Sequence, residues 1–163
     1  MSEENRRIVL ASRPQGVPTA DNFRLETAPI PDLQEGEMLI RTRFLSVDPY
    51  MRGRMNAGAS YAPGVELDEV MVGGAVGDVV ASRHPDFAEG DVAQASIGWQ
   101  SHGVARGEET HKVDPRLGPI STALGVLGMP GMTAYFGLLD VGQLTQLRAG
   151  AAAREGVRRC EKV

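Results

Sequence analysis

The 163-residue chain has a single cysteine, Cys160, and only three histidines. One cysteine cannot form a disulfide within the chain, and it argues against a zinc site built on cysteine ligands. The histidines at positions 84, 102 and 111 show no pair at metal-ligand spacing. The sequence therefore predicts no bound metal, a turn around His84, and solvated positions at strand ends for His102 and His111.

Long apolar runs and blocks of basic residues are missing as well. No uninterrupted apolar stretch approaches the ~20 residues that span a bilayer, and the N-terminus MSEENRRIVL is charged. The net charge is −4, and no basic cluster is large enough to follow a nucleic-acid backbone. These absences argue against membrane and nucleic-acid partners and predict a cytoplasmic protein.

Up to residue 115 the chain is divided by turn residues into short segments with strand character. The clearest is residues 37–47 (EMLIRTRFLSV), where apolar and charged side chains alternate. Further strands are predicted in residues 7–12 (RIVLAS), 23–27 (FRLET) and 70–82 (VMVGGAVGDVVAS). Residues 87–96 (FAEGDVAQAS) and 98–107 (GWQSHGVARG) are each predicted to form a tight turn that leads into a strand. Many short strands with few helix signals are typical of an antiparallel barrel or sandwich.

Three glycines, at positions 73, 74 and 77, invite comparison with a dinucleotide-binding loop. That loop has the pattern Gly-x-Gly-x-x-Gly between a strand and a helix, whereas these glycines lie in a valine-rich stretch that RHPDFAEGD follows. Glycines inside a strand more often mark bulges or close corners of a barrel, which is the interpretation favoured for this segment.

From residue 119 the pattern changes to two short apolar helices, ISTALGVLG and PGMTAYFGLLDVG, broken around residues 128–130. Pro130 is expected at the start of the second helix and Gly142 just beyond its end. A strand-rich body that ends in helices resembles a domain followed by a connector.

Two of the three tyrosines, Tyr50 and Tyr61, lie in loops rich in glycine and proline. A loop tyrosine can donate a hydrogen bond to a carbonyl oxygen as charge develops on it, or it can simply cap the end of the barrel. Arg52 and Arg54 suit either a phosphate clamp or structural ion pairs with Asp48 and nearby carboxylates, and the second interpretation is favoured. The Thr133 hydroxyl suits either a ligand contact or ordinary helix capping.

Four segments together resemble one family: LSVDPYMRGRM, SYAPGVELDEVMVGG, GWQSH and LGVLGMPGMTAYFGLLDVGQ. It is the zinc-independent branch of the medium-chain dehydrogenases and reductases that includes curcumin reductase, prostaglandin reductase and alkenal/one oxidoreductases. The resemblance covers residues 5–143. It implies a mainly β fold, a GroES-like partly open barrel with short C-terminal helices, which the family normally joins to a Rossmann domain that binds NADPH.

The family is NADP(H)-dependent and reduces the carbon–carbon double bond of α,β-unsaturated ketones and aldehydes by hydride transfer. The resemblance implies that Tyr61 and Tyr50 face the active-site cleft, with Tyr61 the better candidate for a substrate or proton-donor contact. It also implies that Met129, Pro130 and Thr133 lie against the nicotinamide end of the cofactor. The small-molecule partner would be an enone or enal.

Residues 144–163 (LTQLRAGAAAREGVRRCEKV) lack the strand and the glycine-rich turn that follow this point in the family. We therefore predict a GroES-like domain with connector helices in residues 1–143 and a divergent tail in 144–163, as a frameshift, an assembly error or a truncated gene would produce. Without a Rossmann domain, the chain alone is expected to lack turnover and to expose sheet edges and an apolar face, which either a partner or a second copy in a homodimer would cover. The alternative function is a non-catalytic GroES-like binding or assembly module.

Overall fold

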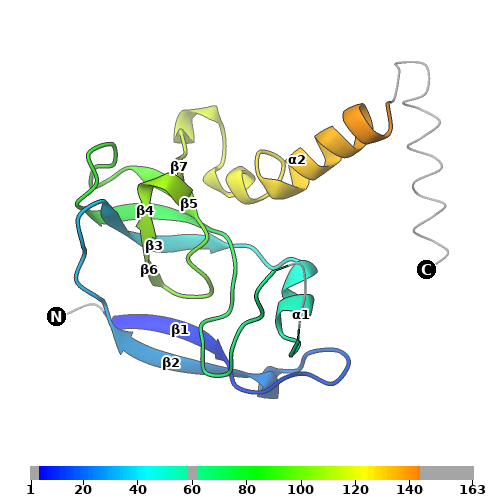
Figure 1. Cartoon of the computed structure of the whole chain (residues 1–163). Coiled ribbons are helices and arrows are strands. Elements are labelled where there is room, and N and C mark those ends of the chain that lie inside the picture. Colours follow the sequence, from blue (N-terminus) through cyan, green and yellow to red (C-terminus); the bar gives the residue numbers. More distant parts are fainter. Residues whose placement is uncertain (1–3, 59–61, 144–163) are drawn as a thin grey trace. The chain divides into compact units, whose positions relative to one another are not determined.

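The computed structural model describes residues 4–58 and 62–143, and strands dominate this part of the chain (Figure 1). A two-stranded antiparallel sheet contains β1 (Glu4–Leu10) and β2 (Phe23–Pro29). A five-stranded antiparallel sheet has the order β6-β3-β4-β5-β7. Its strands are β3 (Glu37–Leu45), β4 (Ala75–Ser82), β5 (Val92–Ala95), β6 (His102–Arg106) and β7 (Thr110–Lys112).

The five-stranded sheet must curl, because its two edge strands are joined by a very short connection. In a flat sheet β6 and β7 would be four strand spacings apart, about 19 Å. Only the 3-10 turn η2 (Gly107–Glu109) joins them, and four residue steps reach about 14 Å even at full extension. The edges therefore approach each other, which confirms the predicted mainly β, partly open barrel.

Helices in the described residues are short. They are α1 (Tyr50–Arg54), α2 (Met129–Phe136), the 3-10 turns η1 (Ala20–Asn22), η3 (Pro115–Leu117) and η4 (Ile120–Leu124), and the π-helical turn η5 (Gly137–Val141). The chain forms two compact units, residues 1–124 and the segment from residue 125 onward, and each is described by itself. The predicted boundary at residue 143 coincides with the last described residue and stays a prediction.

The predicted strands are confirmed in outline, with one clear difference at residues 70–82. Strand β4 begins only at Ala75, and Gly73 and Gly74 precede it outside the strand. Gly73 lies against the indole of Trp99, since a Cβ atom added there would stand 2.9 Å from the ring. The close packing of Trp99 against the backbone therefore accounts for the glycine at position 73.

Gly77 is the glycine that the bulge interpretation explains. It pairs with Thr42 of β3, directly beside a register shift between Thr42 and Phe44. A Cβ atom at position 77 would overlap the carbonyl oxygen of Arg41 and lie 2.8 Å from its carbonyl carbon. Only glycine lets β3 approach β4 this closely.

The first predicted C-terminal helix is shorter than expected. Residues 120–124 form the 3-10 turn η4, and Gly125 then starts a tight turn in which the Gly128 N–H donates to the Gly125 carbonyl at 3.0 Å. The predicted break is confirmed, since α2 begins at Met129 with Pro130 in its first turn. Gly142 directly follows the last helical residue, as predicted.

Besides a small cluster of Val76, Val92 and Ile120, two larger buried apolar clusters stabilise the first unit. One fills the barrel and includes Met38, Ile40, Val79, Phe87, Ala93 and Ile97. The other consists of Leu10, Met51, Met55, Val65 and Met71, with Phe23, Tyr50, Val72 and Trp99 partly buried against it. The second cluster connects β1 to α1 and thereby supports the element that begins with Tyr50.

Candidate functional site

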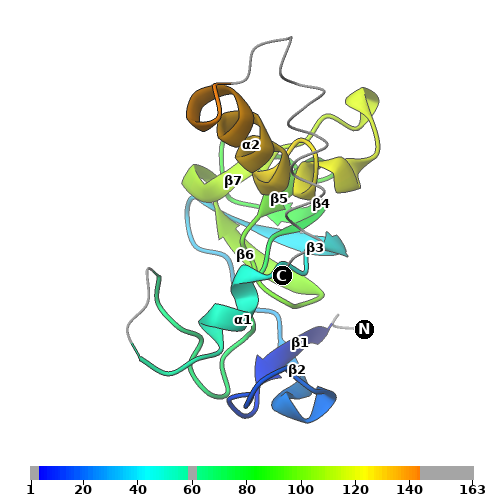
Figure 2. The same ribbon diagram turned by 90° about the vertical axis from the view of Figure 1, so that its right-hand side faces the viewer.

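Tyr50 is the first residue of α1, which follows β3 after a four-residue connection. Pro49 precedes the helix with helical backbone angles, and the Met51 N–H donates to the Asp48 carbonyl at 3.1 Å. Proline pre-sets the backbone angle that a helical turn needs, so the sequence DPYM starts this helix without a side-chain cap. Views from two sides place α1 between the end of β3 and the turn that joins β1 to β2 (Figures 1 and 2).

One face of α1 is anchored in the apolar cluster. Met51 and Met55 are 2% and 4% exposed and pack with Val65 and Met71. Tyr50 is partly buried against the same cluster and has a polar or aromatic interaction of its own. The tyrosine therefore packs against this cluster, as the structural interpretation of the sequence expects, and its contact with a ligand stays a prediction.

Among the described residues, Arg52 does not form the ion pair with Asp48 that the sequence predicts. Its hydrogen bonds to described residues run to the carbonyl oxygens of Gly16 (2.8 Å) and Pro14 (3.1 Å) and to the side-chain oxygen of Asn56 (2.6 Å). The loop after β1 turns back on itself at Gly16, whose φ of +84° favours glycine, and its carbonyls point to α1. The guanidinium satisfies these carbonyls and does not bind Asp48.

Tyr61, the preferred catalytic candidate, lies outside the described residues. It belongs to the stretch between α1 and Val65, whose two ends are described. The Val65 N–H donates to the Arg54 carbonyl at 2.7 Å, so the chain leaves α1 and returns to it before position 66. The role of Tyr61 stays a prediction.

The three cofactor candidates, Met129, Pro130 and Thr133, lie together in the first turns of α2. Met129 is 54% exposed, and Pro130 and Thr133 are exposed as well. The Thr133 hydroxyl donates to the Met129 carbonyl at 2.8 Å, so it is neither a helix cap nor a free donor. It keeps lone pairs with which it can accept a hydrogen bond.

The start of α2 is poorly suited to a phosphate. Proline has no N–H, the Gly131 N–H donates to Gly125, and the Met132 N–H donates to Gly128. A phosphate site at a helix start needs several free N–H groups. What Met129 and Pro130 offer instead is an exposed apolar surface on which a flat ring can pack. These residues of α2 belong to the second compact unit, whereas Tyr50 belongs to the first.

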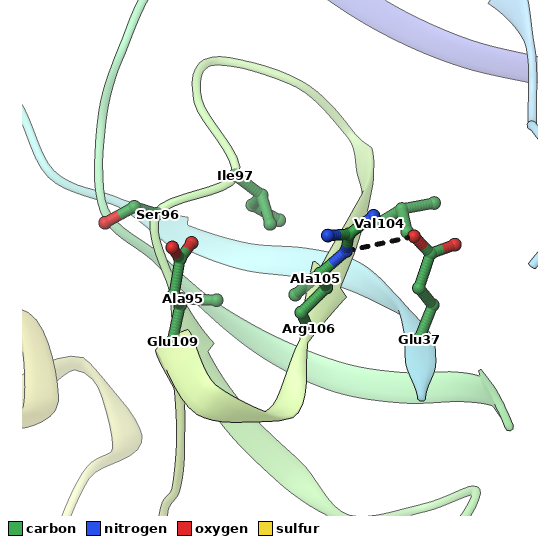
Figure 3. A pocket seen from close by; sticks show the side chains of 8 residues that line it. All are labelled: Glu37, Ala95, Ser96, Ile97, Val104, Ala105, Arg106 and Glu109. Carbon is green, nitrogen blue, oxygen red and sulfur yellow. Dashed lines mark hydrogen bonds and ion pairs between the residues drawn. The ribbon is translucent and has the colours of Figure 1, made fainter. Parts of the chain in front are cut away.

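A polar pocket of about 310 Å³ opens at the gap between β5 and β6 (Figure 3). It is lined by Glu37, Ala95, Ser96, Ile97, Val104, Ala105, Arg106 and Glu109. Arg106 binds Glu37 at 3.4 Å. The sequence analysis did not select these residues, because they become neighbours only when the sheet curls. None of them is aromatic, and the pocket contains none of the predicted site residues.

His102 differs from its prediction. It was expected in solvent but is only 7% exposed, because its backbone N–H donates to the Asn5 side chain at 3.0 Å where β6 meets β1. The predictions for the other two histidines are confirmed. His84 lies in a turn, and His111 is exposed in β7.

Shifted pKa values occur in surface ion pairs. The Arg116 guanidinium and backbone N–H lower the pKa of Asp114 to about 2. The Ala88 N–H and Lys112 lower the pKa of Asp91, and Arg24 and Arg7 lower that of Glu26. These groups stabilise turns and strand pairs. Within residues 4–58 and 62–143, no cluster of three or more metal-ligating side chains occurs and no helix is long and apolar enough to cross a membrane.

Residues 6–113 match the family model described as the N-terminal domain of oxidoreductase. The chain belongs to this family. The match spans β1 to the residue after β7, and so includes both sheets and α1. The family assignment therefore rests on the first compact unit, which contains Tyr50.

Relatives narrow the assignment to the reductases named in the sequence analysis. NADPH-dependent curcumin reductase of Escherichia coli (strain K12) is 51% identical over 141 residues, which are 86% of this chain and 41% of that protein. The protein YfmJ of Bacillus subtilis (strain 168) is 41% identical over 160 residues, which are 96% of this chain and 47% of the YfmJ chain. The second match extends past residue 143. The chain spans less than half the length of these relatives.

The crystal structure of CurA from Vibrio vulnificus in complex with NADPH has the same fold. It superposes with a TM-score of 0.80 at 52% identity and covers 86% of this chain and 42% of that chain. The resemblance to the zinc-independent curcumin reductase branch is thereby confirmed, and so is the GroES-like domain as the matching part.

Proposed function

We propose that the chain is the barrel domain of an NADPH-dependent reductase that reduces the double bond of α,β-unsaturated ketones and aldehydes. The observation that carries this proposal is the 51% identity to NADPH-dependent curcumin reductase over residues that include α1 and α2. We further propose that Tyr61 and Tyr50 contact the substrate and that Met129, Pro130 and Thr133 contact the nicotinamide end of NADPH.

The residues of α2 suit the nicotinamide end of the cofactor in character. Met129 and Pro130 are exposed and apolar, and Thr133 retains acceptor capacity beside them. The start of α2 does not suit the pyrophosphate, since it has few free N–H groups. The proposal therefore assigns the phosphate end to the part of the relatives that this chain does not match.

NADPH, when bound, supplies the hydride that forms a new C–H bond at the β-carbon of the enone. The π electrons then move onto the carbonyl oxygen, which becomes an enolate. A tyrosine hydroxyl stabilises this oxygen by donating a hydrogen bond, and its weakly acidic proton suits it to the task. The α-carbon takes up a proton to complete the reduction. In this scheme α1 presents Tyr50, and the stretch between α1 and Val65 supplies Tyr61.

The chain alone is expected to show negligible consumption of NADPH with an enone such as curcumin, because hydride transfer needs a narrowly fixed geometry. A chimera in which residues 1–143 precede the unmatched C-terminal part of the E. coli curcumin reductase is expected to consume NADPH. Both proteins are assayed by the loss of NADPH absorbance. Turnover by the chain above a no-protein blank would contradict the first expectation, and an inactive but folded chimera would contradict the proposed function. The non-catalytic module is then the remaining candidate.

The role of the tyrosines is tested in the same chimera. Tyr61→Phe is expected to lower kcat about 100-fold, because a donor to the developing oxyanion is lost, and Tyr50→Phe is expected to lower it less. Tyr135→Phe is the matched control, since Tyr135 lies on α2 and packs edge-on against Phe136. If all three variants are as active as the unsubstituted chimera, none of these tyrosine hydroxyls supports the reaction.

A further inference from the structure

Arg13 lies in the loop after β1 and donates hydrogen bonds to three acceptors around α1. Its Nη1 atom donates to the carbonyls of Met55 (3.0 Å) and Val65 (3.1 Å), and its Nη2 atom donates to the Glu66 carboxylate (3.1 Å). The Met55 carbonyl belongs to the C-terminal cap of α1. One side chain therefore holds the end of α1 and the returning chain at position 65.

Arg52 makes the reciprocal connection. It lies within α1 and donates to the carbonyls of Pro14 and Gly16, next to Arg13. We refer to Arg13 and Arg52 as the arginine pair. Each arginine satisfies carbonyls on the segment that carries the other. Both donors come from positions about 40 residues away in the sequence, so each hydrogen bond joins two distant segments.

The arginine pair matters because α1 has little stability of its own. The helix has five residues, contains Gly53 and has no side-chain cap at its N-terminus. Helices of this length do not form in water without tertiary contacts. The buried face of α1 rests on methionine side chains, which are flexible and pack adaptably. Directional hydrogen bonds are therefore what fixes the orientation of α1.

We propose that Arg13 is a positioning residue, which orients α1 and thereby the Tyr50 side chain in the reductase site. The inference rests on the proposed function, because only that proposal makes Tyr50 a site residue. A lysine cannot replace Arg13, since a single ammonium group lacks the planar fork that reaches two carbonyls and a carboxylate together. The Arg13 side chain is only 23% exposed, so water does not readily take over its contacts with the two carbonyls, which are partly buried.

The test compares Arg13→Lys with Arg7→Lys in the 163-residue chain. Arg7 also binds a carboxylate through two nitrogens, Glu26 at 3.0 and 3.2 Å, but on the pairing of β1 with β2. NMR signals of methyl-labelled methionine and ring-labelled tyrosine report the environment of Met55 and Tyr50, with Met38 in the barrel cluster as the internal reference. Arg13→Lys is expected to shift the Met55 and Tyr50 signals and leave Met38 unchanged, whereas Arg7→Lys shifts none of the three.

Unchanged Met55 and Tyr50 signals in Arg13→Lys would overturn the inference. A change at Met38 of similar size would overturn it too, because Arg13 would then support the whole barrel. In the chimera, Arg13→Lys is expected to lower kcat, by no more than Tyr50→Phe lowers it, with an unchanged KM for NADPH. The NMR comparison needs no turnover. An inactive chimera would therefore contradict the proposed function alone, and the signals would still decide the role of Arg13.

Discussion

Replacement of Gly77 by alanine is expected to lower the free energy of unfolding by at least about 3 kcal/mol. The added Cβ would overlap the Arg41 carbonyl oxygen, which is backbone and cannot rotate away. Strands β3 and β4 form the centre of the five-stranded sheet, so separating them disturbs the barrel on both sides. A domain of this size is stabilised by about 5–15 kcal/mol in total, so the variant would lose a large share of its stability.

Urea unfolding followed by the fluorescence of Trp99, the one tryptophan of the chain, measures this loss. Gly53→Ala is the matched control. Gly53 lies in α1, and an added Cβ meets nothing within 4 Å. Alanine is expected to leave the stability unchanged or to raise it by up to about 1 kcal/mol, because it favours a helix. If Gly77→Ala unfolds at the same urea concentration as Gly53→Ala, the close approach of β3 and β4 does not depend on glycine.

Replacement of Asn5 by alanine is expected to cost about 2–4 kcal/mol, because one buried and two partly buried polar groups would lose their partner at once. Asn5 is 5% exposed. Its amide donates to Gln100 at 2.8 Å, and its oxygen accepts from the Ser101 hydroxyl at 3.2 Å and from the His102 N–H at 3.0 Å. This side chain joins the two-stranded sheet to β6.

The control for Asn5 is Asn56→Ala. Asn56 is exposed and accepts one hydrogen bond from Arg52, which water can replace, so we expect a loss within about 0.5 kcal/mol. Thermal or urea unfolding of both variants gives the comparison. Equal losses would mean that the polar contacts between β1 and β6 contribute no more than an exposed hydrogen bond.

The strands were predictable because their patterns are local. Residues 37–47 alternate apolar and charged side chains, and β3 occupies residues 37–45 of that segment. The Pro130 and Gly142 signals also predicted the limits of the last helical segment, since both act on the backbone of their own turn. The start of β4 was missed, because the valine-rich pattern continues through Gly73 and Gly74, whereas the pairing of β4 begins only at Ala75.

The candidate site was only partly predictable. Tyr50 and Met129 were selected through the resemblance of their motifs to the reductase family, and the fold and family are confirmed by the 52% identical Vibrio structure. Nothing in the local sequence of Arg13 indicated its contacts, because its partners are 42 and 52 positions away. Arg52 was misinterpreted for the same reason, since Asp48 is its neighbour in sequence and Pro14 and Gly16 are its neighbours in space.

The sequence by itself determined the strand-rich class, the absence of an internal disulfide and the family motifs, because each depends on residue types and short spacings. The tertiary structure decided which side chains meet. The curl of the sheet brings β6 close to β7, Asn5 unites β1 with β6, and the arginine pair fixes α1. Such contacts depend on how distant segments pack, and residue patterns within a segment carry no record of that packing.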